Sequence, residues 1–471
     1  MEIYVNVKNF GKIKEARVNI SNFTIFVGNN NSGKTQLMEL IYTIITQLSK
    51  TNPNLYIPQI DNIDAYRMDK EEIINLNKWV NQYLKDNIHG IIDDTFNASI
   101  PIEEVTIEFE DIDNGYEIFF LTDRTIDYLF KKELIPSEDL KNMILDRKNI
   151  YGEIKFYGAF VIKNSVEGKE QNEINMRFSE SIPIDVALSM EVGYVLAWII
   201  GGKSPVSSNV LFLPASRMGL MLLYKHYFGN TSQNKDEVIR DKNQNSKGIT
   251  KPVLDFLTFL LNHSYSERVA KQNDKIISFI YENLIDGTIS ENGDATVYTP
   301  KDYDKEIPIF VASSMVNEIV PVVRALTSSD NVDYLFYDEV ETSMHPLKQI
   351  EMVKLLNRLN NQGIKLLVST HSDTMATKIN NLLLLSQGDL DFEAAKTALE
   401  KNGIAIKKED LLVSKNIHVY QFINDQQDKS IVQELEFQKV PSTGYNFNLF
   451  NDSTMNLFEE AKVVMGIDNE N

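Results

Sequence analysis

The fold of this chain is decided by one stretch near its start, Gly28-Asn29-Asn30-Asn31-Ser32-Gly33-Lys34-Thr35. The stretch follows an apolar run, Phe23–Val27, that reads as a buried strand, and it opens a helical segment, Thr35–Tyr42, with apolar residues on one face. A strand, a glycine-containing loop and a helix are the context of a phosphate-binding loop. Gly28 and Gly33 permit the tight turn in which backbone N–H groups and the positive helix end surround phosphate oxygens.

This loop predicts ATP and Mg²⁺ as cofactors. Lys34 would bridge the terminal phosphates, and the hydroxyl of Thr35 would be a ligand of the Mg²⁺ ion. The alternative is a glycine-asparagine turn that fits the pattern by chance, and the flanking strand and helix argue against it. The expected nucleotide-binding residues are Gly28, Asn29, Asn30, Asn31, Ser32, Gly33, Lys34, Thr35 and Gln36.

Two later fragments end apolar strands in polar side chains. Asp333–Glu339 ends in Asp338 and Glu339, and Lys365–Ser372 delivers His371 to its carboxyl end. Ligands of open α/β sheets bind at strand ends of this kind. We expect Asp338 to coordinate the magnesium or to lie just outside its ligands, and Glu339 to polarise the attacking water. His371 would touch the γ-phosphate and hold the water geometry. The alternative is that the two acids only cap a strand, and the presence of the phosphate loop argues against it.

Together these fragments resemble the ABC-type ATPase heads of the SMC, RecF and OLD-like group, which have a phosphate loop, a distant Asp-Glu pair and a switch histidine. The opening segment Ile3–Ile13 and the segment Glu341–Pro346 are similar to the corresponding parts of such heads. The resemblance implies an α/β fold, with a mixed central sheet flanked by helices, an antiparallel β lobe and a helical insertion. Its specific motifs cover residues 1–48 and 295–390.

The family also carries a Ser-Gly signature at a helix start, which contacts the γ-phosphate bound to the opposite subunit. The best candidate here is Ala312–Glu318, after the expected strand Ile307–Val311. By this resemblance Ser313, Ser314 and Asn317 would contact the neighbour's nucleotide. Related sequences usually have glycine where Met315 stands, and a side chain there narrows the approach of phosphate, so hydrolysis would be slow. Alternatively, Ser313 and Ser314 only cap the helix Met315–Leu326.

A further arginine follows another expected strand. Asn209–Leu213 runs into the turn Pro214–Arg217, and a similar Pro-Ala-x-Arg turn recurs in OLD-like and defence-associated ATPases. Arg217 could reach phosphate or a dimer interface as a bidentate donor. It could equally be a structural arginine that holds the following helix, and the sequence leaves both readings open.

Composition sets limits around these motifs. The chain has 471 residues, 43% of them hydrophobic and 24% charged, which is ordinary for a soluble globular protein. The lack of cysteine excludes disulfides and cysteine-ligated zinc. The start of the chain enters a strand at once, and no apolar run approaches the roughly twenty residues that span a bilayer, so a cytoplasmic location without membrane contact is expected. A net charge of −20 disfavours non-specific binding of DNA by a monomer, although nucleic acid stays possible.

The intervening segments carry weaker signals, which give the following expected domains: 1–48, the first part of the head; 49–208, an antiparallel β lobe with a helical insertion; 209–294, a helical arm or partner-binding insertion; 295–390, the second part of the head; and 391–471, strands and a helix that complete it. The expected elements are a helix Glu71–Lys85, a hairpin of Ile102–Glu110 and Tyr116–Leu121, a second hairpin of Tyr151–Lys163 and Glu173–Ser179, a helix Ile182–Ile200, a polar loop 229–250, helices Asp255–Leu261 and Asp274–Leu284, strands His418–Ile423 and Gln433–Gln438, and a helix Asn456–Val464.

The sequence disfavours a TOPRIM nuclease domain and an extended coiled coil. Val166–Glu170 and Asp389–Asp391 have the spelling of a TOPRIM nuclease motif, but the second lies in an expected loop and too few residues follow His371 for such a domain. No heptad repeat runs long enough for an extended coiled coil.

A compact head without a visible effector is similar to the ATPase subunits of bacterial anti-phage systems such as Septu, PARIS and retron-linked modules. The resemblance implies a homo-oligomer built from head-to-head dimers, which restrains or activates a separate nuclease or toxin encoded nearby. The alternative is a RecF-like DNA repair or recombination ATPase that clamps DNA. A transporter ATPase is disfavoured because the sequence shows no glutamine loop and no Leu-Ser-Gly-Gly-Gln signature.

Overall fold

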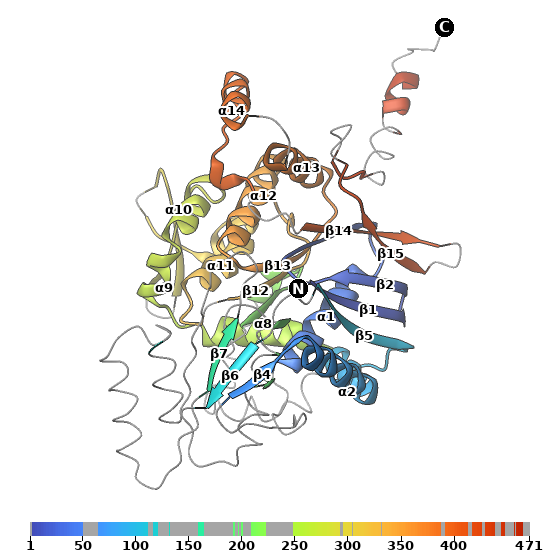
Figure 1. Ribbon diagram of the computed structural model, residues 1–471. Helices are drawn as coiled ribbons and strands as arrows, with labels where there is room; N and C mark the ends of the chain where they lie inside the picture. The colour runs from blue at the N-terminus through green and yellow to red at the C-terminus, as the bar shows by residue number, and fades with distance from the viewer. Residues whose placement is uncertain are drawn as a thin grey trace, which may run out of the picture. The chain divides into compact units, whose positions relative to one another are not determined.

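A computed structural model shows the architecture (Figure 1). It describes residues 2–49, 65–111, 116–120, 131, 159–163, 192–193, 196, 199–200, 209–222, 248–292, 295–303, 305–330, 332–387, 391–412, 417–425, 429–438, 444–447, 456 and 458–464. The chain divides into two compact units, which we call unit 1 (residues 1–6, 44–88 and 105–208) and unit 2 (residues 7–43, 89–104 and 209–471).

The core of unit 2 is a mixed sheet with the strand order β2-β15-β14-β3-β13-β12-β8. All neighbours from β14 to β8 are parallel, whereas β15 is antiparallel to β14. The bounds are β2 Ile13–Asn19, β3 Phe23–Gly28, β8 Val210–Leu213, β12 Tyr334–Tyr337, β13 Lys365–Thr370, β14 Ile417–Asn424 and β15 Ser430–Leu435. Because the apolar runs that predicted these strands lack polar alternation, both faces of the parallel part are expected to be covered.

Helices bury both faces. On one face the ring of Tyr42, from helix α1 (Lys34–Leu48), packs edge-on against Phe212 and Phe336. On the other face Leu335 and Tyr337 join a hydrophobic cluster with residues of five helices. These helices are α8 Lys251–Asn262, α10 Asp274–Asn283, α11 Ser314–Thr327, α12 Pro346–Asn361 and α13 Asp373–Gln387. The parallel strands therefore end between two helical layers, with their carboxyl ends at one edge.

Unit 2 also holds smaller elements, of which one corrects the sequence analysis. The expected strand Ile307–Val311 is wrong: β11 covers only Ile307–Pro308, and Ile309–Val311 forms the 3₁₀ turn η2. Pro308 lacks the N–H that a continued ladder needs. The others are β9 Gly287–Asn292 and β10 Ala295–Pro300, antiparallel to each other, and α9 Glu267–Gln272, α14 Phe392–Lys401 and η3 Lys408–Asp410.

Unit 1 contains a three-stranded antiparallel sheet in the order β4-β6-β7 (β4 Ala65–Met68, β6 Tyr116–Phe120, β7 Ala159–Lys163). The first expected hairpin is wrong, because β5 (Glu104–Glu110) is the neighbour of β1 (Glu2–Phe10) and not of β6. The carbonyl of Ile107 in β5 accepts hydrogen bonds from Asn77 and Asn81 of a helix, at 2.8 and 2.9 Å. Pairing of β5 is thus decided by partners far away in the sequence.

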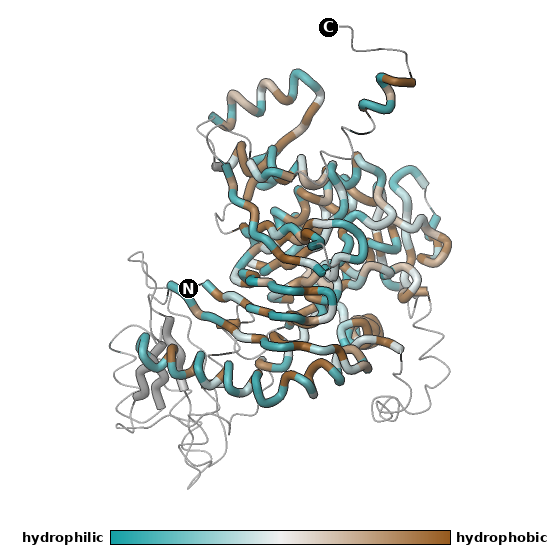
Figure 2. The backbone as a smooth tube through the Cα atoms, turned by 90° about the vertical axis from the view of Figure 1, so that its right-hand side faces the viewer, coloured by the Kyte–Doolittle hydropathy of each residue, from teal (hydrophilic) through white to brown (hydrophobic). Residues whose placement is uncertain are grey.

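The helix that carries these asparagines, α2 (Lys70–Phe96), is longer than the expected Glu71–Lys85 and passes through Gly90 without ending. Its tube alternates between teal and brown in Figure 2, as an amphipathic helix does. The expected helices in 255–261 and 274–284 are confirmed as α8 and α10, and the strand His418–Ile423 is confirmed as β14. The strand expected at Gln433–Gln438 begins earlier, at Ser430, and ends at Leu435.

Several predictions lie outside the described residues. These are the turn Asp113–Gly115, the strand Glu173–Ser179, most of the helix Ile182–Ile200, most of the loop 229–250, and the segment Val166–Glu170. Among the described residues, no helix has both the length and the apolar character needed to cross a bilayer.

Candidate functional site

The loop between β3 and α1 has the backbone of a phosphate cradle. Gly28, Asn31 and Gly33 have φ angles of 155°, 60° and 91°. A Cβ atom at Gly33 would lie 2.8 Å from Cδ1 of Ile13, at the end of a side chain that can shift, so the positive φ angle is the stronger reason for glycine at this position. Asn31 tolerates its left-handed conformation better than most residues do. The sequence Asn29–Asn31 is exposed at the tip of the loop.

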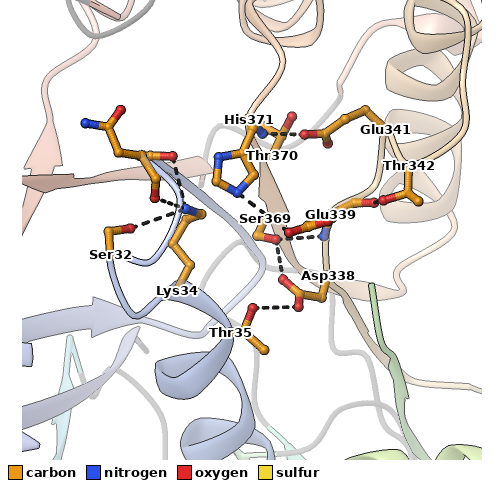
Figure 3. Close-up of polar contacts among 12 residues, drawn as sticks. Ser32, Lys34, Thr35, Asp338, Glu339, Glu341, Thr342, Ser369, Thr370 and His371 are labelled. Carbon is orange, nitrogen blue, oxygen red and sulfur yellow. Dashed lines mark hydrogen bonds and ion pairs between the residues drawn. The ribbon is translucent and has the colours of Figure 1, made fainter. Parts of the chain in front are cut away.

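Lys34 folds back into this loop. Its Nζ donates to the carbonyl oxygens of Gly28 and Asn29, at 3.0 and 2.8 Å, and to the hydroxyl of Ser32, at 3.3 Å. Burial lowers the pKa of Lys34 to about 8, although the carboxylates of Asp338, Glu339 and a third acid, Glu341, oppose the shift. The ammonium group thus lies inside the loop, against its carbonyl oxygens (Figure 3).

The hydroxyl of Thr35 donates to Oδ2 of Asp338 at 2.7 Å. Asp338 is 1% exposed and comes directly after β12, while Thr35 lies in the first turn of α1. The other oxygen of Asp338, Oδ1, accepts a 2.5 Å hydrogen bond from Ser369 of β13. A hydroxyl and a carboxylate from two different segments therefore meet at one end of the sheet, as the sequence predicts.

Glu339 follows with an unusual backbone. Its φ angle is 44°, in the left-handed region that non-glycine residues rarely adopt. The hydroxyl of Ser369 accepts a hydrogen bond from the Glu339 N–H at 2.8 Å. The Glu339 carboxylate remains 42% exposed and faces the phosphate loop (Figure 3).

His371 lies opposite this carboxylate, with Nε2 3.9 Å from Oε1 of Glu339. Burial is the main cause of a lowered pKa at His371, and the charge of Lys34 adds to it. The imidazole is therefore neutral at pH 7. Its backbone N–H donates to Oε1 of Glu341 at 2.5 Å, so that acid fixes the segment that carries the histidine.

Arg217 does not reach the phosphate loop. Its side chain is fully buried and donates to the backbone carbonyls of Pro214 and Asp338, at 2.8 and 2.7 Å. It also pairs with Glu318 of α11 at 2.7 Å. Of the two readings that the sequence left open, the buried structural contact is the one that the single chain shows.

The candidate signature splits in two. Ser313 and Ser314 are exposed at the start of α11, and Ser313 caps the helix by accepting the N–H of Val316 at 3.4 Å. Asn317 is fully buried, and its amide donates to the carbonyls of Ile309, Ala312 and Ser313. Asn317 thus braces the loop before the helix, and its expected contact with a neighbour's nucleotide stays a prediction. Met315 is half-buried and packs on the core.

Two site residues were not singled out from the sequence, Ser369 and Glu341. Ser369 stands beside Asp338 because β12 and β13 run parallel, with Tyr337 opposite Val368. Aligning the starts of the expected strands Asp333–Tyr337 and Lys365–Thr370 gives nearly this register. The position of Ser369 beside Asp338 could therefore have been predicted from the sequence. Gln36, an expected nucleotide contact, packs its side chain against the turn at Gly11.

No curated protein matches. Among solved structures, an Smc head bound to the C-terminal winged-helix domain of ScpA is 10% identical, with a TM-score of 0.37 over 93% of this chain and 98% of that chain. An Smc head with an extended coiled coil from Pyrococcus furiosus, bound to the C-terminal domain of ScpA, has a TM-score of 0.33 at 10% identity, over 98% of both chains. The SMC head domain from Thermotoga maritima has a TM-score of 0.32 at 10% identity, over 93% of this chain and all of that chain.

The family comparison matches most of the chain. The family described as AAA ATPase domain matches residues 1–376, a span that includes the phosphate loop, both carboxylates and His371. Since this span is most of the chain, the protein belongs to the AAA ATPase domain family.

Proposed function

We propose that this ATPase-family chain binds ATP with Mg²⁺ and hydrolyses it at the site formed by Lys34, Thr35, Asp338, Glu339 and His371. One observation carries the proposal: three segments far apart in the sequence bring these five side chains to one end of a parallel sheet (Figure 3). Nothing outside unit 2 is needed to build this site.

The roles follow from position and charge. The Lys34 ammonium, held at the loop carbonyls, would turn to the terminal phosphates, which lie where the loop N–H groups converge. Glu339 is the exposed carboxylate of the pair and would accept a proton from the attacking water. The neutral His371 would hold that water or a γ-phosphate oxygen by a hydrogen bond.

The residues fit a magnesium ion. The Thr35 hydroxyl and the Asp338 carboxylate, 2.7 Å apart, are the oxygen donors that Mg²⁺ prefers, and the ion usually keeps waters and phosphate oxygens as its other ligands. When bound, the ion would neutralise charge that develops on the phosphates. Thr35 and Asp338 would hold it, and Ser369 would keep the Asp338 carboxylate oriented.

We further propose that two heads pair around ATP, with Ser313 and Ser314 of one head facing the nucleotide of the other. Both serines are exposed at the N-terminal end of α11, where the helix dipole favours an anion. In a single head Asn317 is buried and bonded to its own loop, so the two serines are the groups of this segment that lie open to a neighbour. We expect this contact to be weak and hydrolysis to be slow.

The biological role we propose is that of a regulatory subunit in an anti-phage defence system, whose ATP-bound oligomer restrains or activates a separate nuclease or toxin. The support is the resemblance of the motif order to such subunits. The competing role is that of a RecF-like DNA repair ATPase, and the net charge of −20 weighs against it.

The test is to purify Glu339→Gln, which should bind ATP without hydrolysing it, from cells that also carry the neighbouring genes. Native mass and contents of the complex are then measured. A stoichiometric second protein on an ATPase oligomer would support the regulatory role. A bare dimer with co-purified DNA would favour the repair role and overturn ours.

A further inference from the structure

Arg217 is the most deeply buried charged side chain near the site, yet the proposed hydrolysis does not use it. It follows β8 and is 0% exposed. Its Nη1 donates to the carbonyl oxygen of Asp338 at 2.7 Å, and its Nη2 donates to that of Glu339 at 3.2 Å. Its guanidinium also lies over the ring of Tyr337, 4.6 Å from the centroid. One side chain thus holds three consecutive residues at the end of β12.

These contacts fall on strained backbone. Glu339 has its left-handed φ of 44°, a conformation that persists only where surrounding groups over-determine it. Ser369 fixes the Glu339 N–H at 2.8 Å. On the carbonyl side, Arg217 and the hydroxyl of Thr342 both donate to the same oxygen, Thr342 at 2.8 Å. The direction of the Glu339 side chain therefore depends on Arg217, although the two side chains do not meet.

Arg217 is itself held by Glu318. Oε2 of Glu318 lies 2.7 Å from Nε of Arg217, as an ion pair without the alignment of a hydrogen bond, and Glu318 is 2% exposed. Oε1 of Glu318 accepts the N–H of Met218 at 3.2 Å. Glu318 belongs to α11, whose exposed start carries Ser313 and Ser314. The pair therefore joins the backbone of Glu339 to the helix that would face the neighbouring head.

We propose that Arg217 is a positioning residue for hydrolysis, which holds the backbone of Glu339 in its left-handed turn while Glu318 ties it to α11. The proposal rests on the proposed function, in which Glu339 is the base. A planar guanidinium spans two adjacent carbonyl oxygens and the Glu318 carboxylate at once, which a lysine ammonium does not do. Lys34 and Thr35, which would bind the nucleotide, hydrogen-bond to the loop and to the Asp338 carboxylate, whereas Arg217 reaches Asp338 only at its backbone carbonyl. Loss of Arg217 should therefore weaken ATP binding much less than it slows turnover.

The test replaces the whole pair, because removal of one partner would leave the other charge buried. In Arg217→Met/Glu318→Leu the turnover number should fall by about 100-fold, the loss that misplacement of a reacting group by about 1 Å causes. The affinity for a non-hydrolysable ATP analogue should fall far less than the turnover number does. The single variant Arg217→Lys keeps the charge and nearly the volume of the side chain, and its turnover number should also lie well below that of wild type.

The matched control is another ion pair of α11, between the buried Arg324 and the partly exposed Glu291 of β9, whose Nη2 and Oε1 lie 3.1 Å apart. Arg324 also donates to Thr296 and touches none of the site residues named above. Arg324→Met/Glu291→Leu should lower the melting temperature and leave both turnover and affinity unchanged.

Three results would overturn the proposal: normal turnover in Arg217→Met/Glu318→Leu, equal losses of turnover in both double variants, or a parallel loss of ATP affinity. If the Arg217 double variant does not fold, Arg217→Lys decides alone, and full turnover in it refutes the proposal. A wild-type protein that binds ATP without hydrolysing it would refute the proposed function itself, which the wild-type rate shows before any variant is made.

Discussion

The lowered pKa of Lys34 makes nucleotide affinity depend on pH in a range where few other groups titrate. Lys34 is 5% exposed, and its pKa is about 8 because burial outweighs the attraction of Asp338, Glu339 and Glu341. Only the charged ammonium binds phosphate well. With a pKa of about 8, the charged fraction is about 90% at pH 7 and about 10% at pH 9.

The affinity of the free protein for ATP should therefore fall by about tenfold from pH 7 to pH 9, which is about 1.4 kcal/mol. The sign follows from linkage: a ligand that binds only the protonated lysine is weakened as the pH rises through the pKa of the free protein. The assay is calorimetric titration with a non-hydrolysable ATP analogue in the presence of Mg²⁺. The phosphates of the analogue stay ionised over this pH range.

Lys34→Arg is the control. Its guanidinium stays charged at every pH of the series, so its affinity should stay flat whatever its absolute value. A wild-type affinity that is constant from pH 7 to pH 9 would refute the reasoning, and so would a fall of the same size in Lys34→Arg.

The remaining predictions concern the supports of the site. Glu39, 6% exposed in α1, has its pKa raised to about 7 by burial, although the hydrogen bond from Thr250 opposes this. Its stabilisation is complete below the unfolded pKa of 4.5 and is lost as pH rises through about 7. The free energy of unfolding of Glu39→Gln, measured relative to wild type, should thus rise by about 2.5 kcal/mol from pH 5 to pH 8. Parallel melting curves at the two pH values would check this, and a constant difference would contradict it. Ser369→Ala leaves the Glu339 N–H without its acceptor and should lower turnover about tenfold, because an unmade hydrogen bond costs about 1–3 kcal/mol. Steady-state kinetics would measure it, and an unchanged rate would show that Ser369 does not orient the pair.

The sequence predicted the elements that carry the site because each has a strong local cause. Val27 to Lys34 passes from an apolar run through two glycines into an amphipathic helix. Asp338 directly follows an apolar run, and His371 lies three residues after the end of another. Parallel strands bring such ends together whatever the loops between them do. The approach of Thr35 to Asp338 was therefore available from the sequence.

What the sequence missed depends on tertiary contacts. Ile102–Glu110 and Tyr116–Phe120 both have strand periodicity, but periodicity does not name a partner, and the two strands join different sheets. The direction of Arg217 is set by the buried carboxylate of Glu318, which lies 101 positions away in the sequence. Asn317 fits the signature by its spacing, but its amide donates hydrogen bonds to carbonyl oxygens of its own loop.

The central claim is that Glu339 makes this site hydrolytic. The most direct measurement is a single turnover of ATP with Mg²⁺ in wild type and in Glu339→Gln, in which released phosphate and the bound nucleotide are both quantified. The account predicts phosphate and ADP from wild type, and intact ATP retained by Glu339→Gln. Phosphate release at the wild-type rate from Glu339→Gln would contradict it.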